Sequence, residues 1–101
     1  MFVYSGTLDT RKAATLSRVQ NAYQLLGAGK AAEALALAKE AVSIDPQDIL
    51  SQSALGNISA AMGQKDEARK AWETALGTAR QLNAEEQASV VPELEEKLKK
   101  L

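Results

Sequence analysis

Cysteine and histidine are both missing from the 101 residues of this sequence. Without cysteine the chain forms no disulfide, no thiolate metal site and no thiol nucleophile. Without histidine it lacks the commonest general base and the commonest metal ligand. We therefore expect a chain that is not an enzyme and that holds no metal and no cofactor.

Aromatic residues and net charge are also scarce. The four aromatic residues are Phe2, Tyr4, Tyr23 and Trp72, so any core must be built mainly from Ala, Leu, Val and Ile and will be thin. Twelve basic and thirteen acidic residues leave a net charge of −1, which gives no long-range attraction for nucleic acid or an anionic membrane. No apolar run approaches the roughly 20 residues that span a bilayer, and residues 1–10 do not resemble a signal peptide. We expect no nucleic-acid partner, no direct membrane insertion and, by default, a cytoplasmic location.

Glycine and proline divide most of the chain into helical segments. Asp9 is a suitable N-cap for a first helix, which Gly27 and Gly29 bring to an end. Pro46 ends the second helix, and Asp48 can cap the third. The sequence therefore predicts helices over residues 9–26, 30–44, 48–62, 66–82 and 84–101.

The two ends of the chain have distinct patterns. Phe2-Val3-Tyr4 is short and β-prone with no second strand to pair with, which favours either a disordered terminus or the remnant of an upstream domain. Residues 84–101 carry an apolar stripe at helical spacing, made of Ala84, Ala88, Val91, Leu94, Leu98 and Leu101. Three i, i+4 pairs support this helix, namely Glu93/Lys97, Glu95/Lys99 and Glu96/Lys100. Pro92 lies inside it, so we expect either a kink or a fresh helix start there.

Self-comparison at an offset of 34 residues reveals an internal repeat. It aligns Leu16 with Leu50, Gly29 with Gly63, Glu33 with Glu67, Ala34 with Ala68 and Ala41 with Ala75. The period, together with Leu55-Gly56, Gly63, Ala68, Trp72 and Ala75-Leu76 in fixed order, resembles the tetratricopeptide repeat over about residues 15–82. Gly56 and Ala68 are small where the two helices of a hairpin come closest, and Trp72 at helical spacing is expected in the core.

The resemblance implies an all-α fold, with antiparallel helical hairpins stacked as a short right-handed solenoid and closed by a terminal capping helix. Residues 1–9 would be a tail or an upstream remnant, 10–46 the first unit, 47–83 the second and 84–101 the cap. Arg18 and Asn21 depart from the family pattern, which usually has large apolar residues there. Two units are fewer than the usual minimum of about three, so the ends must be covered by the capping helix, a second copy or the rest of a longer protein.

In this family the first helices of successive repeats line a concave groove that receives an extended peptide or a helix. The groove positions implied here are mostly apolar: Leu16, Val19, Tyr23, Leu26, Leu50, Ser53, Asn57 and Ala60. The best-known relatives clamp a C-terminal carboxylate of chaperone tails with lysines, asparagines and an arginine, and only Asn57 has a counterpart here, which argues against that ligand. Tyr23 belongs equally to the core if the first helix is rotated by one position.

The resemblance favours a protein–protein interaction scaffold that binds a protein or peptide of unknown identity. The alternative is a structural role, either as an accessory C-terminal domain of a larger protein, such as an enzyme, or as a homo-oligomer. The glutamates of residues 85–96 have the number for acid–base chemistry, but that chemistry needs a cleft and opposed environments. A terminal helix exposed to solvent supplies neither, which again disfavours catalysis.

Overall fold

The computed structural model describes residues 6–101, with side chains from Thr10 onward. Within this range the chain folds into five helices: α1 (Gly6–Gly27), α2 (Ala31–Ile44), α3 (Ile49–Ala61), α4 (Lys65–Ala79) and α5 (Ala84–Lys99). The predicted all-α fold is confirmed for these residues. The expectations for Phe2-Val3-Tyr4 fall outside the described part of the chain.

The helix boundaries agree best with prediction where a cap or a breaker fixes them. α2 and α3 lie within a residue or so of their predicted ends. α1 begins at Gly6, three residues before Asp9, so the expected N-cap role of Asp9 is wrong. Residues 6–8 contain no proline, and nothing in their sequence stops the helix from extending over them. α4 ends at Ala79 rather than at Leu82.

The turns inside the two hairpins are built in the same way. Gly29 and Gly63 adopt φ values of +82° and +78°, the left-handed region that glycine enters without steric cost. Directly after them, the Lys30 N–H donates to the Leu25 carbonyl over 2.8 Å, and the Gln64 N–H donates to the Ser59 carbonyl over 2.9 Å. These are the bonds of a Schellman motif, repeated at the offset seen in the sequence.

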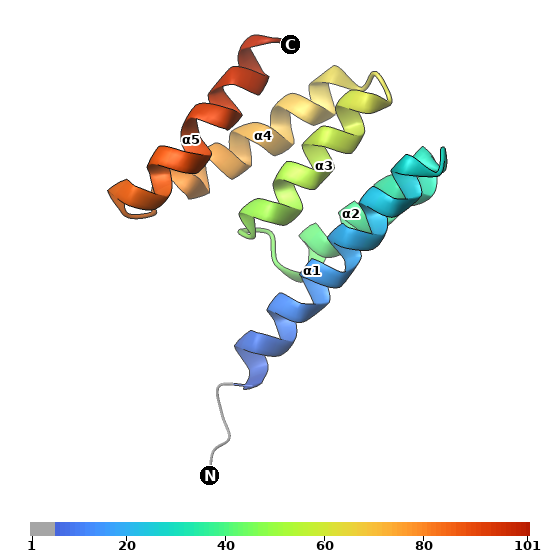
Figure 1. The fold of residues 1–101 in the computed structure, drawn as a ribbon, viewed down its shortest axis with the longest axis horizontal. Coiled ribbons are helices and arrows are strands. Elements are labelled where there is room, and N and C mark those ends of the chain that lie inside the picture. Colours follow the sequence, from blue (N-terminus) through green and yellow to red (C-terminus); the bar gives the residue numbers. More distant parts are fainter. Residues whose placement is uncertain (1–5) are drawn as a thin grey trace.

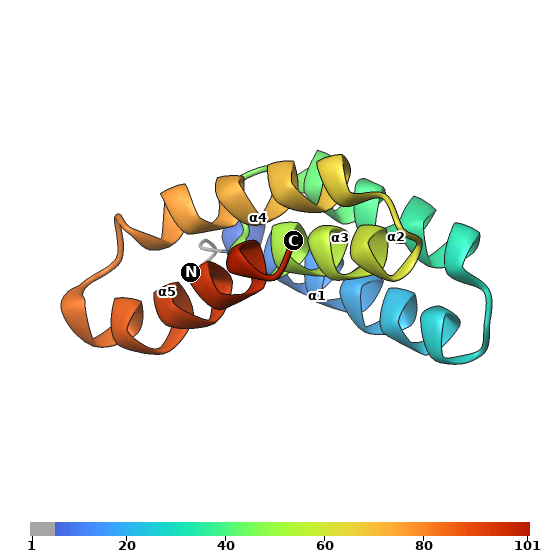
Figure 2. The ribbon, with the colours of Figure 1, turned by 90° about the horizontal axis from the view of Figure 1, so that it is seen from above.

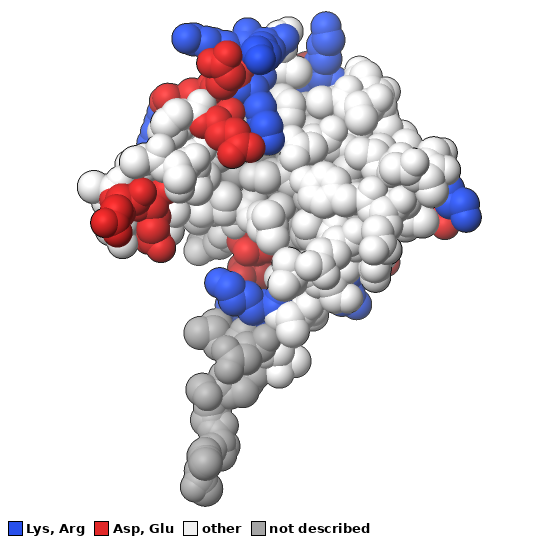
Figure 3. Space-filling view, in the orientation of Figure 1, with Lys and Arg blue, Asp and Glu red and all other residues white. Residues whose placement is uncertain are grey.

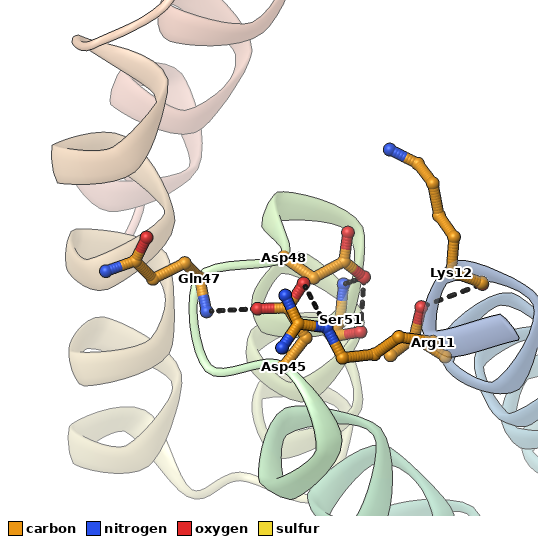
Figure 4. Close-up of polar contacts among 7 residues, drawn as sticks. Arg11, Lys12, Asp45, Gln47, Asp48 and Ser51 are labelled. Carbon is orange, nitrogen blue, oxygen red and sulfur yellow. Dashed lines mark hydrogen bonds and ion pairs between the residues drawn. The ribbon is translucent and has the colours of Figure 1, made fainter. Parts of the chain in front are cut away.

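Two aspartates hold the connection between the hairpins, which Figure 4 shows in close-up. The Asp48 side chain caps α3 as predicted, because it accepts a hydrogen bond from the Ser51 backbone N–H over 3.1 Å. The Asp45 carboxylate accepts one from the Gln47 N–H over 3.2 Å and lies 4.0 Å from the Arg11 guanidinium on α1. The turn between α2 and α3 is therefore also tied to the first helix.

The helices stack in two layers. α1 packs antiparallel against α2, and α3 against α4, while α2–α3, α1–α3 and α4–α5 contacts join the hairpins and the last helix (Figure 1). Figure 2 shows α1, α3 and α5 in one layer and α2 and α4 in the other, along a gently arched body whose inner side carries α1, α3 and α5. The shortest dimension, 18 Å, corresponds to these two layers.

Alanine dominates the core, as the scarcity of aromatic residues predicts. Nine of the buried hydrophobic residues are alanines: Ala22, Ala34, Ala38, Ala41, Ala54, Ala68, Ala71, Ala75 and Ala79. Trp72 is only 5% exposed and packs with Leu76 and Leu94 where α4 meets α5. The prediction that Trp72 is a core residue is confirmed.

α5 runs through Pro92 as a single helix, so the predicted fresh start at that residue is wrong. The Asn83 side chain caps it, accepting a hydrogen bond from the Glu86 N–H over 2.9 Å. Leu94 is 2% exposed against the α4 core, and this packing holds the helix together although Pro92 cannot donate a backbone hydrogen bond.

Two of the three predicted ion pairs on α5 are present. Lys97 lies 3.2 Å from Glu93, and Lys100 lies 3.7 Å from Glu96. Glu95 does not pair with Lys99 but with Arg80 at the end of α4, over 3.2 Å. That contact adds a polar link between the last two helices.

Candidate functional site

Three large hydrophobic side chains stand out on the surface of the described part of the chain. Leu16, Tyr23 and Leu50 are 44%, 38% and 46% exposed, and they lie on α1 and α3. All three belong to the groove positions that the family resemblance implies. A residue of this size loses favourable burial when it stays in water, and here three of them gather on two neighbouring helices.

Few charges surround these side chains. From Ala13 to Ala28 the one charged residue is Arg18, and residues 49–61 contain none. The Arg18 guanidinium is already paired within the protein. Its Nε lies 3.1 Å from the Glu40 carboxylate on α2, and its Nη1 donates to the Ala14 carbonyl. Figure 3, which views the layer of α1, α3 and α5, shows a broad uncharged area with Lys, Arg, Asp and Glu gathered towards its margins.

The repeat fixes how these residues lie relative to one another. Leu16 and Leu50 occupy equivalent positions on neighbouring helices, as do Tyr23 and Asn57, because each pair is separated by 34 residues. Leu16 and Tyr23 are seven residues apart, which is two helical turns, or about 10.5 Å along α1. Leu16, Tyr23, Leu50 and Asn57 thus form the four corners of a patch, which we call the α1–α3 face.

Asn57 is the polar corner of this face and connects four helices. Its Nδ2 donates to the Tyr23 hydroxyl on α1 over 2.8 Å. Its Oδ1 accepts from Trp72 Nε1 on α4 over 3.2 Å and from Lys97 Nζ on α5 over 3.0 Å. Indole N–H and ammonium groups are donors only, so they fix which end of the amide faces them and direct Nδ2 towards Tyr23.

Lys97 bridges a gap between two helices. No Cα atom of α3 lies within 8 Å of a Cα atom of α5, although α1 and α3 do approach to that distance. The long Lys97 side chain crosses this separation to reach Asn57, and its Nζ lies 5.9 Å from the centre of the Trp72 ring. One lysine therefore joins α5 to Asn57 through a hydrogen bond and to Trp72 through a cation–π contact.

Trp72 fits against α3 because Gly56 has no side chain. A Cβ atom built on Gly56 would lie 2.3 Å from Trp72 Nε1 and 2.4 Å from Trp72 Cδ1. Real Cβ atoms do not approach ring atoms so closely, so the indole lies directly on the helix backbone. The same placement brings its N–H to the side chain of the next residue, Asn57.

The predicted groove positions divide into three groups. Leu16, Tyr23 and Leu50 are exposed, and Leu26, Ser53, Asn57 and Ala60 are partly buried. Val19 is 2% exposed and packs with Ala41 and Ala54, so it belongs to the core rather than to a surface that a partner could touch. Lys97 was not among the predicted groove positions, because the sequence assigned it to an i, i+4 pair with Glu93, which the structure also shows.

Other classes of site find no support in the described residues. Among the side chains that the structure describes, from Thr10 to Leu101, no group of three or more acidic residues is arranged to hold a metal ion. No helix in this range is both long and apolar enough to cross a membrane. The glutamates at residues 93, 95 and 96 are engaged in ion pairs on exposed helix surface.

Antiparallel hairpins stacked at a 34-residue repeat, with exposed apolar side chains on their first helices, define a helical-repeat protein. A family model described as tetratricopeptide repeat matches residues 25–90, well over half of the chain, and the chain belongs to that family. Neither the curated proteins nor the solved structures gave a match. Repeats of this family generally mediate protein–protein interactions and generally serve as non-catalytic modules.

Proposed function

We propose that the chain is a protein-interaction scaffold and that its α1–α3 face binds a segment of a partner protein. The observation that supports this most directly is the exposure of Leu16, Tyr23 and Leu50 on one uncharged face. Covering the exposed part of each side chain would gain on the order of 1 kcal/mol. Together these residues can supply a central apolar contact, which is where interfaces concentrate their binding energy.

The polar corner complements this apolar contact. In the described residues the Tyr23 hydroxyl accepts from Asn57 and makes no other hydrogen bond, so its own hydrogen is available to a partner. Asn57 uses one of its two amide hydrogens, which leaves a second donor beside the first. Backbone carbonyl groups of a bound polypeptide are suitable acceptors for both.

The other predicted groove positions would contribute less directly to binding, because they are less exposed. Leu26, Ser53 and Ala60 are partly buried and would form the margin of the contact. Val19 lies beneath the surface and would support the face without touching the partner.

Site-specific photo-crosslinking tests the proposal. A photoreactive phenylalanine analogue is placed at Leu16 or Leu50 in the full chain, and a matched control carries it at Glu73, which is exposed on α4 in the other layer. We expect one discrete cross-linked protein from the two positions on α1 and α3 and none from the control. The same protein should escape capture by a Tyr23→Ala, Leu50→Ala double variant whose helical circular-dichroism signal is unchanged.

Two results would contradict the proposal. Cross-links of equal yield from Glu73 would place the contact elsewhere on the surface. Capture that survives the double variant would show that these exposed side chains do not contribute to binding.

A further inference from the structure

We infer that the α1–α3 face is shaped for an amphipathic α-helix with an uncharged contact side, rather than for an extended peptide. This inference rests on the proposed function and specifies the partner. It follows from the spacing of the exposed side chains, from the lack of charge around them and from the donors at the polar corner.

The spacing distinguishes a helix from a strand. Leu16 and Tyr23 lie about 10.5 Å apart along α1, and a partner helix places residues i and i+7 on one side at this same distance. An extended strand presents same-side residues at steps of about 6.7 Å, so its successive contacts fall at about 6.7 and about 13 Å. Of these two conformations, the helix is the one whose same-side spacing matches two contacts two turns apart along α1.

The width of the face leads to the same conclusion. α1 and α3 pack side by side, and packed helices have axes about 8–10 Å apart. Leu16 and Leu50 stand at the same level on these two helices, so a third helix of about 10 Å diameter can lie over the line between them. Its residues at i and i+7 would meet Leu16 and Tyr23, and a residue at i+3 or i+4 would lie between them.

Charge complementarity defines the contact side of this helix. Apart from Arg18, which is held by Glu40, residues 13–28 and 49–61 offer no charged group to pair with. A charged partner residue in the centre of the contact would lose water without gaining a counter-ion, which is costly. The contact side is therefore apolar, and charged residues are confined to the sides that face away.

The polar corner fixes the direction of the bound helix. The groups it offers are donors, namely the Tyr23 hydroxyl, the Asn57 amide and the Lys97 ammonium. The last four carbonyl groups of a helix have no partner within the helix, and that end carries partial negative charge. The bound helix should thus point its C-terminal end towards Asn57 and Lys97.

Two phage-displayed libraries screened against the intact chain test this inference. One presents a 15-residue alanine-based helix with positions i, i+3, i+4 and i+7 randomised, and the other presents random linear heptapeptides. We expect the helix library to enrich apolar residues at i and i+7. The selected peptides should bind at least tenfold more weakly to Leu16→Glu and should lose binding when a proline is placed at their centre. A matched control, Ala36→Glu, adds the same charge to an exposed position on α2 and should leave binding unchanged.

The possible outcomes separate this inference from the proposed function. If only the linear library yields binders, and Leu16→Glu weakens them, the inference of a helical partner is wrong while the proposed binding face stands. If binders from both libraries keep their affinity for the Leu16→Glu variant, the α1–α3 face is not the binding site. Self-association in sedimentation that Leu16→Glu abolishes would make a second copy of the chain the occupant and would also overturn the inference.

The direction is tested with a selected peptide that carries a nitroxide label at one end. Trp72 is the only tryptophan, so its indole N–H gives a single identifiable NMR signal next to Asn57. A label at the C-terminal end should broaden this signal more than a label at the N-terminal end. The opposite order would overturn the assigned direction.

Discussion

Replacing Gly56 with alanine should destabilise the protein even though alanine favours helices. The new Cβ would lie 2.3 Å from Trp72 Nε1 and 2.9 Å from Trp72 Cε2, so the indole or the helix must move. Overpacking of this kind costs about 1–3 kcal/mol. If the ring shifts and its N–H loses Asn57 as acceptor, a further cost of about 1–3 kcal/mol follows.

Alanine is worth about 1 kcal/mol more than glycine inside a helix, which offsets part of this loss. When the ring shifts and the hydrogen bond is lost, the free energy of unfolding should therefore fall by about 1–5 kcal/mol, with a midpoint near 3. For a domain of this size each kcal/mol lowers Tm by about 4–8 °C. Urea unfolding followed by far-ultraviolet circular dichroism measures the change, and the fluorescence of the single tryptophan reports whether the indole has moved.

Gly77→Ala is the matched control, because Gly77 is also inside a helix but a Cβ there meets no atom within 4 Å. It should leave the Trp72 spectrum unchanged and stabilise the protein by up to about 1 kcal/mol. If Gly56→Ala behaves like Gly77→Ala, the indole does not lie against the Gly56 backbone and the packing described for Trp72 is wrong.

Three further variants, at Pro92 and at Asn57, test α5 and the polar corner by the same unfolding measurement. Pro92→Ala restores an N–H that can donate to the Ala88 carbonyl and should stabilise the protein by about 1–3 kcal/mol; a loss of stability would mean that the proline ring makes an essential contact. Asn57→Leu leaves the Trp72 N–H without an acceptor and should cost about 1–3 kcal/mol, whereas Asn57→Asp keeps an acceptor for Trp72 and Lys97 and should cost less. Equal losses from the two Asn57 variants would show that its oxygen is not the group that matters.

The sequence predicts the fold well where chemistry local to a few residues decides the structure. Gly29 and Gly63 reach left-handed angles that other residues avoid, and Asp48 can cap a helix only from the position directly before it. The N-cap predicted at Asp9 is wrong because an aspartate can also lie inside a helix when the residues before it are helical, as residues 6–8 are here. The fresh helix start expected at Pro92 is absent because Leu94 packs against α4, a contact with another helix that the residues around Pro92 do not reveal.

The candidate site was predictable to the extent that the repeat defines it. The resemblance to the tetratricopeptide repeat led to Leu16, Tyr23 and Leu50, all of which the structure leaves exposed. The resemblance does not distinguish a residue on the face from one just beneath it, and this is why Val19 was assigned to the groove although it is buried. Lys97 reaches Asn57 across 40 residues and between helices whose backbones do not touch, and no local pattern marks such a contact.

The order in which the helices touch also bears on how the chain folds. In the described part of the chain, every helix contacts its neighbours in sequence, and α1–α3 is the one pairing that skips a helix. The sequence separation between touching residues is therefore short, and proteins of this low contact order fold in microseconds to milliseconds. Such a chain can also begin folding at either hairpin, because each core cluster is built from one hairpin and the helix that follows it, without the distant end of the molecule.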